Sequence, residues 1–137
     1  MKVVLDEGAI MPTRAHEFDA GLDLYTPMDI QFKPCSMEVV DTGVHIQIPQ
    51  YFVGLVKSRS GLMAKMGVVA GEGTIDCGYT GSLKVMLFNH SRHFRFIKAG
   101  DRIAQLVITP CILPKLVKFE SLEETERGDC GLGSTGR

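Results

Sequence analysis

Short runs in which apolar and polar residues alternate recur along the whole chain. In the clearest run Val44, Ile46 and Ile48 alternate with His45 and Gln47, and a proline ends it. A period of two places the apolar side chains on one face of a half-buried β-strand. Glycine, proline, asparagine and aspartate separate the runs, as expected of turns. We predict strands at 2–5, 20–25, 28–32, 40–48, 52–57, 82–88, 93–97, 103–109 and 116–119.

Only the segment 60–66 predicts a helix. It contains good helix formers, its first residue Ser60 is able to cap a helix, and Gly67 follows as a stop signal. Many short strands with a single short helix indicate an all-β barrel or sandwich. We expect one β-barrel domain at 1–120. The polar, glycine-rich arm at 121–137 contains too little apolar surface to fold by itself.

Charge and cysteine content narrow the class of protein. The 137 residues carry a net charge of −1 with both signs mixed along the chain, which is unlike a nucleic-acid-binding protein. The four cysteines stand singly and have neither zinc-finger nor redox spacing, so we expect reduced thiols in a cytoplasmic protein. The first residues lack the long apolar run of a signal peptide or membrane anchor, and we expect no membrane contact.

Candidate ligand-binding residues cluster between positions 57 and 89. Arg59 and Ser60 stand at a predicted turn, a glycine-rich bend follows at 70–74, and Asp76 and Tyr79 come next. Cationic and hydroxyl donors followed by a carboxylate and an aromatic ring suit a ligand that carries phosphate. The alternative is a basic loop and a hairpin with a buried tyrosine, and the residue types alone leave both open.

The C-terminal segment 127–137 has an unusual composition. It is rich in glycine and hydroxyl residues, has an arginine at each end and lacks the lysine of a Walker loop. Glycine-rich backbone is able to wrap a phosphate chain through its N–H groups, which predicts a lid that a ligand orders. A frayed chain end is the alternative.

Five segments resemble the five ordered motifs of the trimeric dUTPases, the dUTP nucleotidohydrolases. They are AGLDL at 20–24, RSGL at 59–62, GTIDCGY at 73–79, GDRIAQ at 100–105 and RGDCGLGSTG at 127–136. The resemblance implies a jelly-roll-like β-barrel and a homotrimer with active sites between its subunits. It also implies Mg²⁺-dependent hydrolysis of dUTP to dUMP and pyrophosphate, which limits uracil in DNA and supplies dUMP for dTMP synthesis.

The resemblance also implies roles for single residues. Asp76 is expected to orient and activate the attacking water and to contact the sugar 3′-hydroxyl, and Asp23 to hold Mg²⁺ through a metal-bound water. Tyr79 is expected to lie beneath the deoxyribose, main-chain groups of 70–74 to pair with uracil, and the arm at 121–137 to close over an active site. The implied substrate-binding residues are Arg59, Ser60, Gly61, Gly73, Thr74, Ile75, Tyr79, Gln105, Arg127, Leu132, Gly133, Ser134 and Thr135.

Two details of these motifs refine the expectation. Asp101 and Arg102 are expected to form a structural turn and an ion pair rather than to contact substrate. Leu132 stands where the family usually has a phenylalanine that stacks over uracil. Leucine covers a base by apolar contact but lacks aromatic stacking, so we expect a less firmly closed lid.

Two other functions share features of this sequence. A dCTP deaminase has the same barrel and a similar arginine-serine motif. This chain carries Met86 at the position of that family's catalytic glutamate, and a thioether cannot shuttle protons. A catalytically silent regulatory module on the same barrel is the second alternative. Asp23, Asp76 and Tyr79 favour the enzyme, and release of pyrophosphate from dUTP separates the two.

Overall fold

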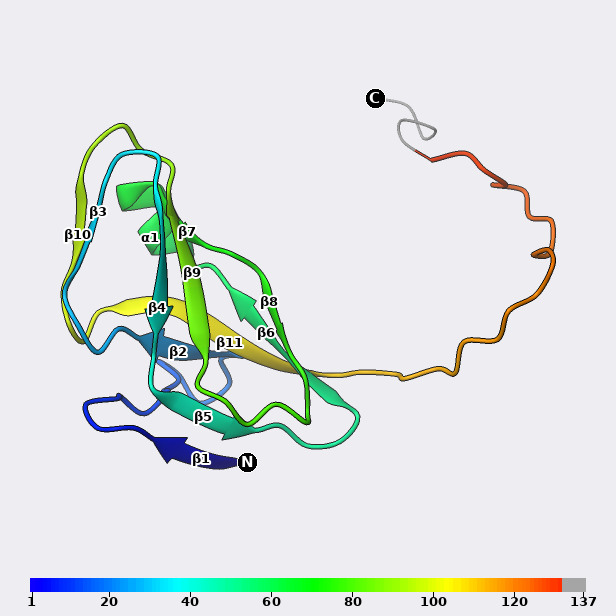
Figure 1. Cartoon of the computed structure of the whole chain (residues 1–137), viewed down its shortest axis with the longest axis horizontal. Coiled ribbons are helices and arrows are strands. Elements are labelled where there is room, and N and C mark those ends of the chain that lie inside the picture. Colours follow the sequence, from blue (N-terminus) through cyan, green and yellow to red (C-terminus); the bar gives the residue numbers. More distant parts are fainter. Residues whose placement is uncertain (132–137) are drawn as a thin grey trace.

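The computed structural model describes residues 1–131, and strands make up most of its regular secondary structure (Figure 1). An all-β fold with one short helix is present, as the alternation pattern predicts. The strands are β1 (Lys2–Leu5), β2 (Gly21–Tyr25), β3 (Ile30–Phe32), β4 (Met37–Asp41), β5 (Val44–Gln47), β6 (Phe52–Lys57), β7 (Val68–Ala70), β8 (Gly73–Ile75), β9 (Lys84–Asn89), β10 (Arg95–Ile97) and β11 (Arg102–Pro110), and the helix is α1 (Ser60–Met66).

Sheets of antiparallel strands surround one apolar core. The largest sheet has the order β2-β11-β6-β8, a second has the order β4-β9-β7, and the pairs β1-β5 and β10-β3 complete the wall. Partners such as β2 and β11 are distant in the sequence, so the fold depends on long-range contacts. The core consists of Leu24, Phe32, Val40, Val44, Ile46, Ile48, Val56, Val68, Ala70, Leu83, Val85, Leu87, Ile97, Ile103, Ala104 and Leu106.

Most predicted strands are confirmed, and the exceptions have local causes. The single strand predicted at 40–48 is wrong, because Gly43 adopts a positive φ of 65° and turns the chain between β4 and β5. A side chain at this position is also excluded by space, since its Cβ would lie 2.8 Å from the Cβ of Ala9. The glycine-rich bend predicted at 70–74 includes the end of β7 and the start of β8.

Helix α1 is confirmed, but its N-terminal cap differs from the prediction. Arg59 occupies the N-cap position with extended backbone, and no side chain makes a capping hydrogen bond there. Ser60 is the first helical residue, so its hydroxyl is not used as a cap. Gly67 ends the helix as predicted: its φ is 67°, and its N–H donates to the Met63 carbonyl over 2.9 Å.

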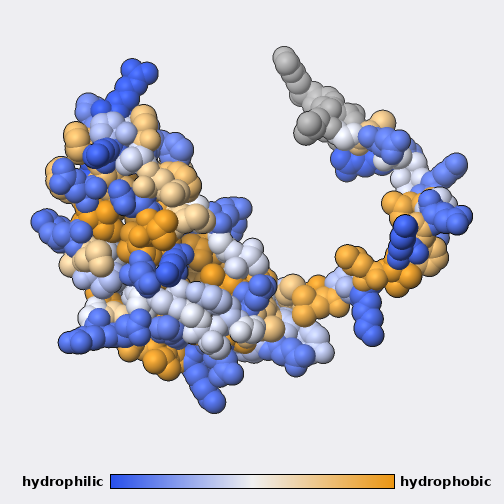
Figure 2. All heavy atoms as spheres, viewed as in Figure 1, coloured by the Kyte–Doolittle hydropathy of each residue, from blue (hydrophilic) through white to orange (hydrophobic). Residues whose placement is uncertain are grey.

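Residues 111–131 form an extended arm that leaves the end of β11 and runs away from the barrel (Figure 1). The strand predicted at 116–119 is wrong, because this segment pairs with no strand in the part of the chain that the structure describes. Exposed apolar side chains follow the arm, where Figure 2 shows orange atoms. They are Ile112, Leu113, Leu116, Val117, Phe119 and Leu122. Within residues 1–131, no helix has the length and apolar character needed to cross a membrane.

Candidate active site

Two hollows on the barrel surface hold the predicted site residues of the barrel, except Gly73. The larger hollow, of about 490 Å³, is formed by β2, β11, the start of α1 and the segment before β2. Its lining includes Asp19, Gly21, Asp23, Arg59, Ser60, Gly61, Arg102 and Gln105. The smaller hollow, of about 200 Å³, is lined by Thr74, Ile75, Asp76, Tyr79 and Lys84.

Strand register builds the larger hollow. β11 lies between β2 and β6, and Gln105 on β11 is directly opposite both Asp23 and Lys57. Arg59 lies two residues after the end of β6, and its side chain reaches Asp23 in the same hollow. Facing positions on neighbouring strands bring side chains into contact. Residues separated by more than 80 positions along the chain thus form one site.

Asp23 is the electrostatic centre of the larger hollow. Its carboxylate is 13% exposed and accepts a hydrogen bond from Arg59 Nε at 2.9 Å on one oxygen and from Arg102 Nη1 at 3.1 Å on the other. Arg59 Nη1 also donates to the Arg102 carbonyl at 3.3 Å. Two guanidinium groups on one carboxylate leave an excess of positive charge, which suits an anionic ligand.

The turn and the ion pair expected of Asp101 and Arg102 are both present. The Asp101 carboxylate accepts a hydrogen bond from the Lys98 N–H at 2.9 Å. Arg102 forms its ion pair with Asp23 and also lines the larger hollow. Sequence reasoning missed this site residue, because only the pairing of β11 with β2 brings it to Asp23.

Gly21 makes room for the Gln105 side chain. A Cβ on Gly21 would lie 2.2 Å from Gln105 Oε1 and 3.1 Å from Gln105 Cβ, both too close for a side chain to fit without displacement. Gln105 Nε2 donates to the Ser58 carbonyl at 3.1 Å. The glycine of the AGLDL motif therefore allows the glutamine of another motif to lie in the hollow.

The smaller hollow is formed mainly by a turn. Asp76 directly follows β8, and its carbonyl accepts a hydrogen bond from the Tyr79 N–H at 3.0 Å. The Tyr79 hydroxyl donates to the Ser82 carbonyl at 2.8 Å. Tyr79 is 42% exposed, so the alternative of a buried tyrosine in a hairpin is wrong. Lys84, which sequence reasoning did not single out, lines the same hollow.

The bend at 70–74 is tied to the segment before α1 by Ser58, a residue that sequence reasoning also missed. The Ser58 hydroxyl donates to the Ala70 carbonyl at 2.8 Å and accepts from the Ala70 N–H at 2.9 Å. The Gly71 N–H donates to the Met86 carbonyl. These main-chain groups already have partners, whereas β8 is an edge strand with one side unpaired within the described sheet.

The two hollows share no lining residue. The larger one brings together Asp23, Arg59, Ser60, Gly61 and Gln105, and the smaller one contains Thr74, Ile75, Asp76 and Tyr79. Gly73 lies in β8, directly opposite Val56. Arg127 lies on the extended arm, where its Nε donates to the Cys130 carbonyl at 3.1 Å. The predicted residues Leu132, Gly133, Ser134 and Thr135 lie outside the described residues.

Comparison with known proteins gives consistent matches over nearly the whole chain. The family model described as dUTPase matches residues 7–136. The deoxyuridine 5'-triphosphate nucleotidohydrolase of Mycobacterium sp. (strain JLS) is 46% identical over 140 residues, covering 96% of this chain and 91% of the relative. That of Corynebacterium efficiens is 47% identical over 136 residues, covering 97% and 75%.

Solved structures agree with these relatives. The dUTPase of Staphylococcus bacteriophage 80alpha with dUPNHPP has a TM-score of 0.92 at 34% identity, covering 99% of this chain and 98% of that one. A mutant dUTPase from phage phi11 of S. aureus, whose structure reveals the coordination of a structural Mg(II) ion, has a TM-score of 0.83 at 32% identity, covering 90% and 98%. The likeness confirms the jelly-roll-like β-barrel.

Proposed function

Because this chain belongs to the dUTPase family and is a dUTP nucleotidohydrolase, we propose that it cleaves dUTP by Mg²⁺-dependent, in-line attack of water on the α-phosphorus. The observation that carries this proposal is the pair of arginines on Asp23, a cluster with one excess positive charge beside Ser60 and Gln105. The second carboxylate of the hollow, Asp19, accepts a hydrogen bond from the His16 N–H. In a chain of net charge −1 this local excess suits a triphosphate. The products are dUMP and pyrophosphate.

Arg59 and Ser60 bind the phosphates in this proposal. A guanidinium has five N–H donors, and Asp23 and the Arg102 carbonyl accept hydrogen bonds from Arg59 without using all of them. Asp23 thereby fixes the plane of the guanidinium while donors remain for phosphate oxygens. The Ser60 hydroxyl makes no capping bond, and Gly61 next to it lets the backbone approach the ligand closely. Gln105 adds a polar contact on the opposite wall.

Asp76 is the general base and orients the attacking water. As the new oxygen–phosphorus bond forms, the water proton moves to the Asp76 carboxylate, and the bond from the α-phosphorus to the bridging oxygen of pyrophosphate breaks. Positioned general bases contribute about 10²- to 10⁴-fold to such reactions. The same carboxylate contacts the sugar 3′-hydroxyl, which aligns the nucleotide with the water.

Mg²⁺ enters the proposal through Asp23. A carboxylate has about four acceptor positions, and the two arginine contacts use one on each oxygen, so each oxygen keeps a position for a metal-bound water. Mg²⁺ retains several waters and needs few protein ligands when substrate phosphates also bind it. This fits residues 1–131, where no three His, Cys, Asp or Glu side chains are grouped to hold a metal. When bound, the ion offsets negative charge on the phosphates.

Selectivity rests on Tyr79 and on the edge strand β8. The Tyr79 ring is exposed to a ligand, and its hydroxyl bond to Ser82 fixes the ring, which then leaves no room for a 2′-hydroxyl. Main-chain groups on the unpaired side of β8 pair with the uracil edge. Cytosine carries a donor where uracil carries an acceptor, so a fixed backbone pattern disfavours dCTP.

We also propose a homotrimer with active sites between subunits. Two observations support it: the two hollows are separate in one chain, and the arm exposes a row of apolar residues. In this trimer the larger hollow of one subunit faces the smaller hollow of its neighbour, and together they complete an active site. The arm at 121–137, with Arg127 and the segment 132–135, closes over an active site. The four cysteines are free thiols, which suits the cytoplasm.

Release of pyrophosphate from dUTP in the presence of Mg²⁺ tests the proposal. We expect wild-type protein to release it and Asp76→Asn to lower kcat by about 10²- to 10⁴-fold while dUTP binding persists, because the amide keeps the shape but cannot take the proton. Glu38→Gln, on the exposed side of β4, serves as the control and should retain activity. A wild type that releases no pyrophosphate would falsify the proposed hydrolysis of dUTP. An Asp76→Asn variant as active as the wild type would reject Asp76 as the general base.

A further inference from the structure

The loop at 76–82 carries Asp76 and Tyr79, and two side chains of the β4–β5 hairpin hold it to the barrel. The Asp41 carboxylate on β4 accepts a hydrogen bond from the Ser82 hydroxyl. His45 on β5 contacts the Thr80 carbonyl through Nδ1 at 2.8 Å. Both anchors therefore act on the loop from one side, outside the two hollows that bind dUTP in the proposed function.

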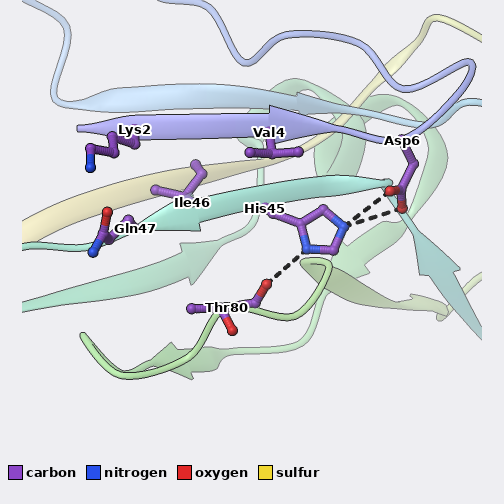
Figure 3. A pocket seen from close by; sticks show the side chains of 7 residues that line it. All are labelled: Lys2, Val4, Asp6, His45, Ile46, Gln47 and Thr80. Carbon is purple, nitrogen blue, oxygen red and sulfur yellow. Dashed lines mark hydrogen bonds and ion pairs between the residues drawn. The ribbon is translucent and has the colours of Figure 1, made fainter.

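The His45 ring also has a second partner. Its Nε2 lies 3.2 Å from both carboxylate oxygens of Asp6, which follows β1. Figure 3 shows the ring between Asp6 on one side and Thr80 on the other, at one end of a hollow lined by β1 and β5. The His45 side chain is 29% exposed. It thus bridges three segments: the end of β1, β5 and the loop that carries Asp76.

The chemistry of the two partners determines which form of the ring fits. A peptide carbonyl accepts hydrogen bonds only, and so does an ionised carboxylate. Both contacts can be made together only when both ring nitrogens carry a proton, so the geometry calls for the imidazolium. A neutral ring keeps one N–H and must give up one of the two contacts.

We propose that His45 is a positioning residue: by joining the Thr80 carbonyl to the Asp6 carboxylate, it holds the loop that presents Asp76 and Tyr79 to dUTP. This inference rests on the proposed function. His45 touches no reacting atom; it acts through the backbone of the loop. The neighbouring Asp41 to Ser82 contact holds the far end of the same loop, so loss of His45 loosens the loop without detaching it.

The surrounding charges favour the protonated ring. Hydrogen bonding to the Thr80 carbonyl, followed by the bond to Asp6, raises the pKa of His45 above its usual value, and the nearby Asp41 adds to the effect. Lys84 on β9 pairs with Asp41 at 3.6 Å and partly offsets that charge. Lys2 on β1 lines the same hollow. Because the folded-state pKa is raised, the bridge is complete below neutral pH and is lost as the pH rises through that pKa.

The kinetic test compares the pH dependence of KM and kcat for dUTP from about pH 6 to about pH 9. In the wild type we expect KM to rise by about two- to tenfold across this range, the effect of losing one ordinary hydrogen bond. His45→Gln, which has no titrating ring, should start with the raised KM and show no such rise. His93→Gln, whose ring makes no hydrogen bond in residues 1–131, should follow the wild type.

Hydrogen exchange of the nucleotide-free protein tests the bridge without activity. Amides at 79–81 should exchange about two- to tenfold faster in His45→Gln and in Asp6→Asn, with core amides of β9 and β11 unchanged. If the wild type is inactive on dUTP but the two variants still show faster loop exchange than the wild type, the bridge is retained and only the proposed function is rejected. Unchanged loop exchange in Asp6→Asn, or an identical pH profile in His45→Gln, would overturn the inference. If His45→Gln fails to fold, Asp6→Asn carries both measurements.

Discussion

The two hollows are built in opposite ways. In the larger one, Asp23 is 13% exposed and is held by arginines from two separate segments, so the charges are fixed by long-range strand pairing. In the smaller one, Tyr79 is 42% exposed, and its hydrogen bonds go to the nearby carbonyls of Asp76 and Ser82. In the proposed mechanism, one chain therefore organises phosphate binding in advance, whereas placement of the proposed general base depends on a loop, its anchors and the proposed neighbouring subunit.

The largest effect is expected from breaking the larger hollow. Arg59→Ala removes a phosphate donor and leaves Asp23 with Arg102 alone, so we expect kcat/KM for dUTP to fall by about 10²- to 10³-fold. Arg59→Lys should recover only part of this loss, because an ammonium cannot reproduce the planar fork. Arg92→Ala, at the exposed turn after β9, is the control. Steady-state kinetics with dUTP measure this effect. A fall in kcat/KM of less than threefold in Arg59→Ala would argue that the larger hollow does not bind the triphosphate.

Much of the fold was accessible from sequence because strand periodicity is a local signal. Alternation at Val44, Ile46 and Ile48 correctly identified core residues, and Gly67 correctly ended the helix. The turn at Gly43 and the absence of a strand at 116–119 were not predicted. Both depend on tertiary neighbours. Gly43 has a positive φ and packs beside Ala9, and the apolar run at 116–119 has no strand to pair with in the described residues.

Residues of the candidate site were predicted from motifs that resemble those of the dUTPase family rather than from residue type alone. Asp23, Arg59 and Gln105 were selected by motif, and the structure places all three in one hollow. The ion pair of Arg102 was expected, but its partner Asp23 was not, and Ser58 was missed, because their partners lie on other strands and no local pattern reveals the register. The separation of the two hollows also could not be predicted from the sequence, because the position of one loop relative to another depends on tertiary structure.

A moderate effect is expected from Gly21→Ala, which alters the larger hollow without removing a charge. The added methyl group would overlap Gln105 Oε1 and crowd its Cβ, so Gln105 must move and lose its bond to the Ser58 carbonyl. We expect kcat/KM to fall by about three- to tenfold, the effect of one displaced hydrogen bond. Glu38→Ala, on the exposed side of β4, is the control and should match the wild type. Kinetics of Gly21→Ala equal to those of Glu38→Ala would contradict the role of Gly21.

The smallest effect concerns an anchor of the smaller hollow, the half-exposed Asp41. Its hydrogen bond from Ser82, and next that from the Gly43 N–H, lower its pKa in the folded protein. A lowered pKa stabilises the fold above the unfolded-state pKa, and the contribution is lost as the pH falls below about 4. Solvent screening limits it to about 1 kcal/mol or less.

Urea unfolding at several pH values measures this contribution. The free energy of unfolding of the wild type should fall more steeply below about pH 4 than that of Asp41→Asn, which cannot ionise. Asp129→Asn, on the exposed arm, is the control and should show the wild-type slope. Parallel curves for wild type and Asp41→Asn would mean that Ser82 is held by the Leu83 backbone bonds to Thr42 and Val44 rather than by Asp41. The smaller hollow would then depend more on His45, whose ring contacts the Thr80 carbonyl at 2.8 Å.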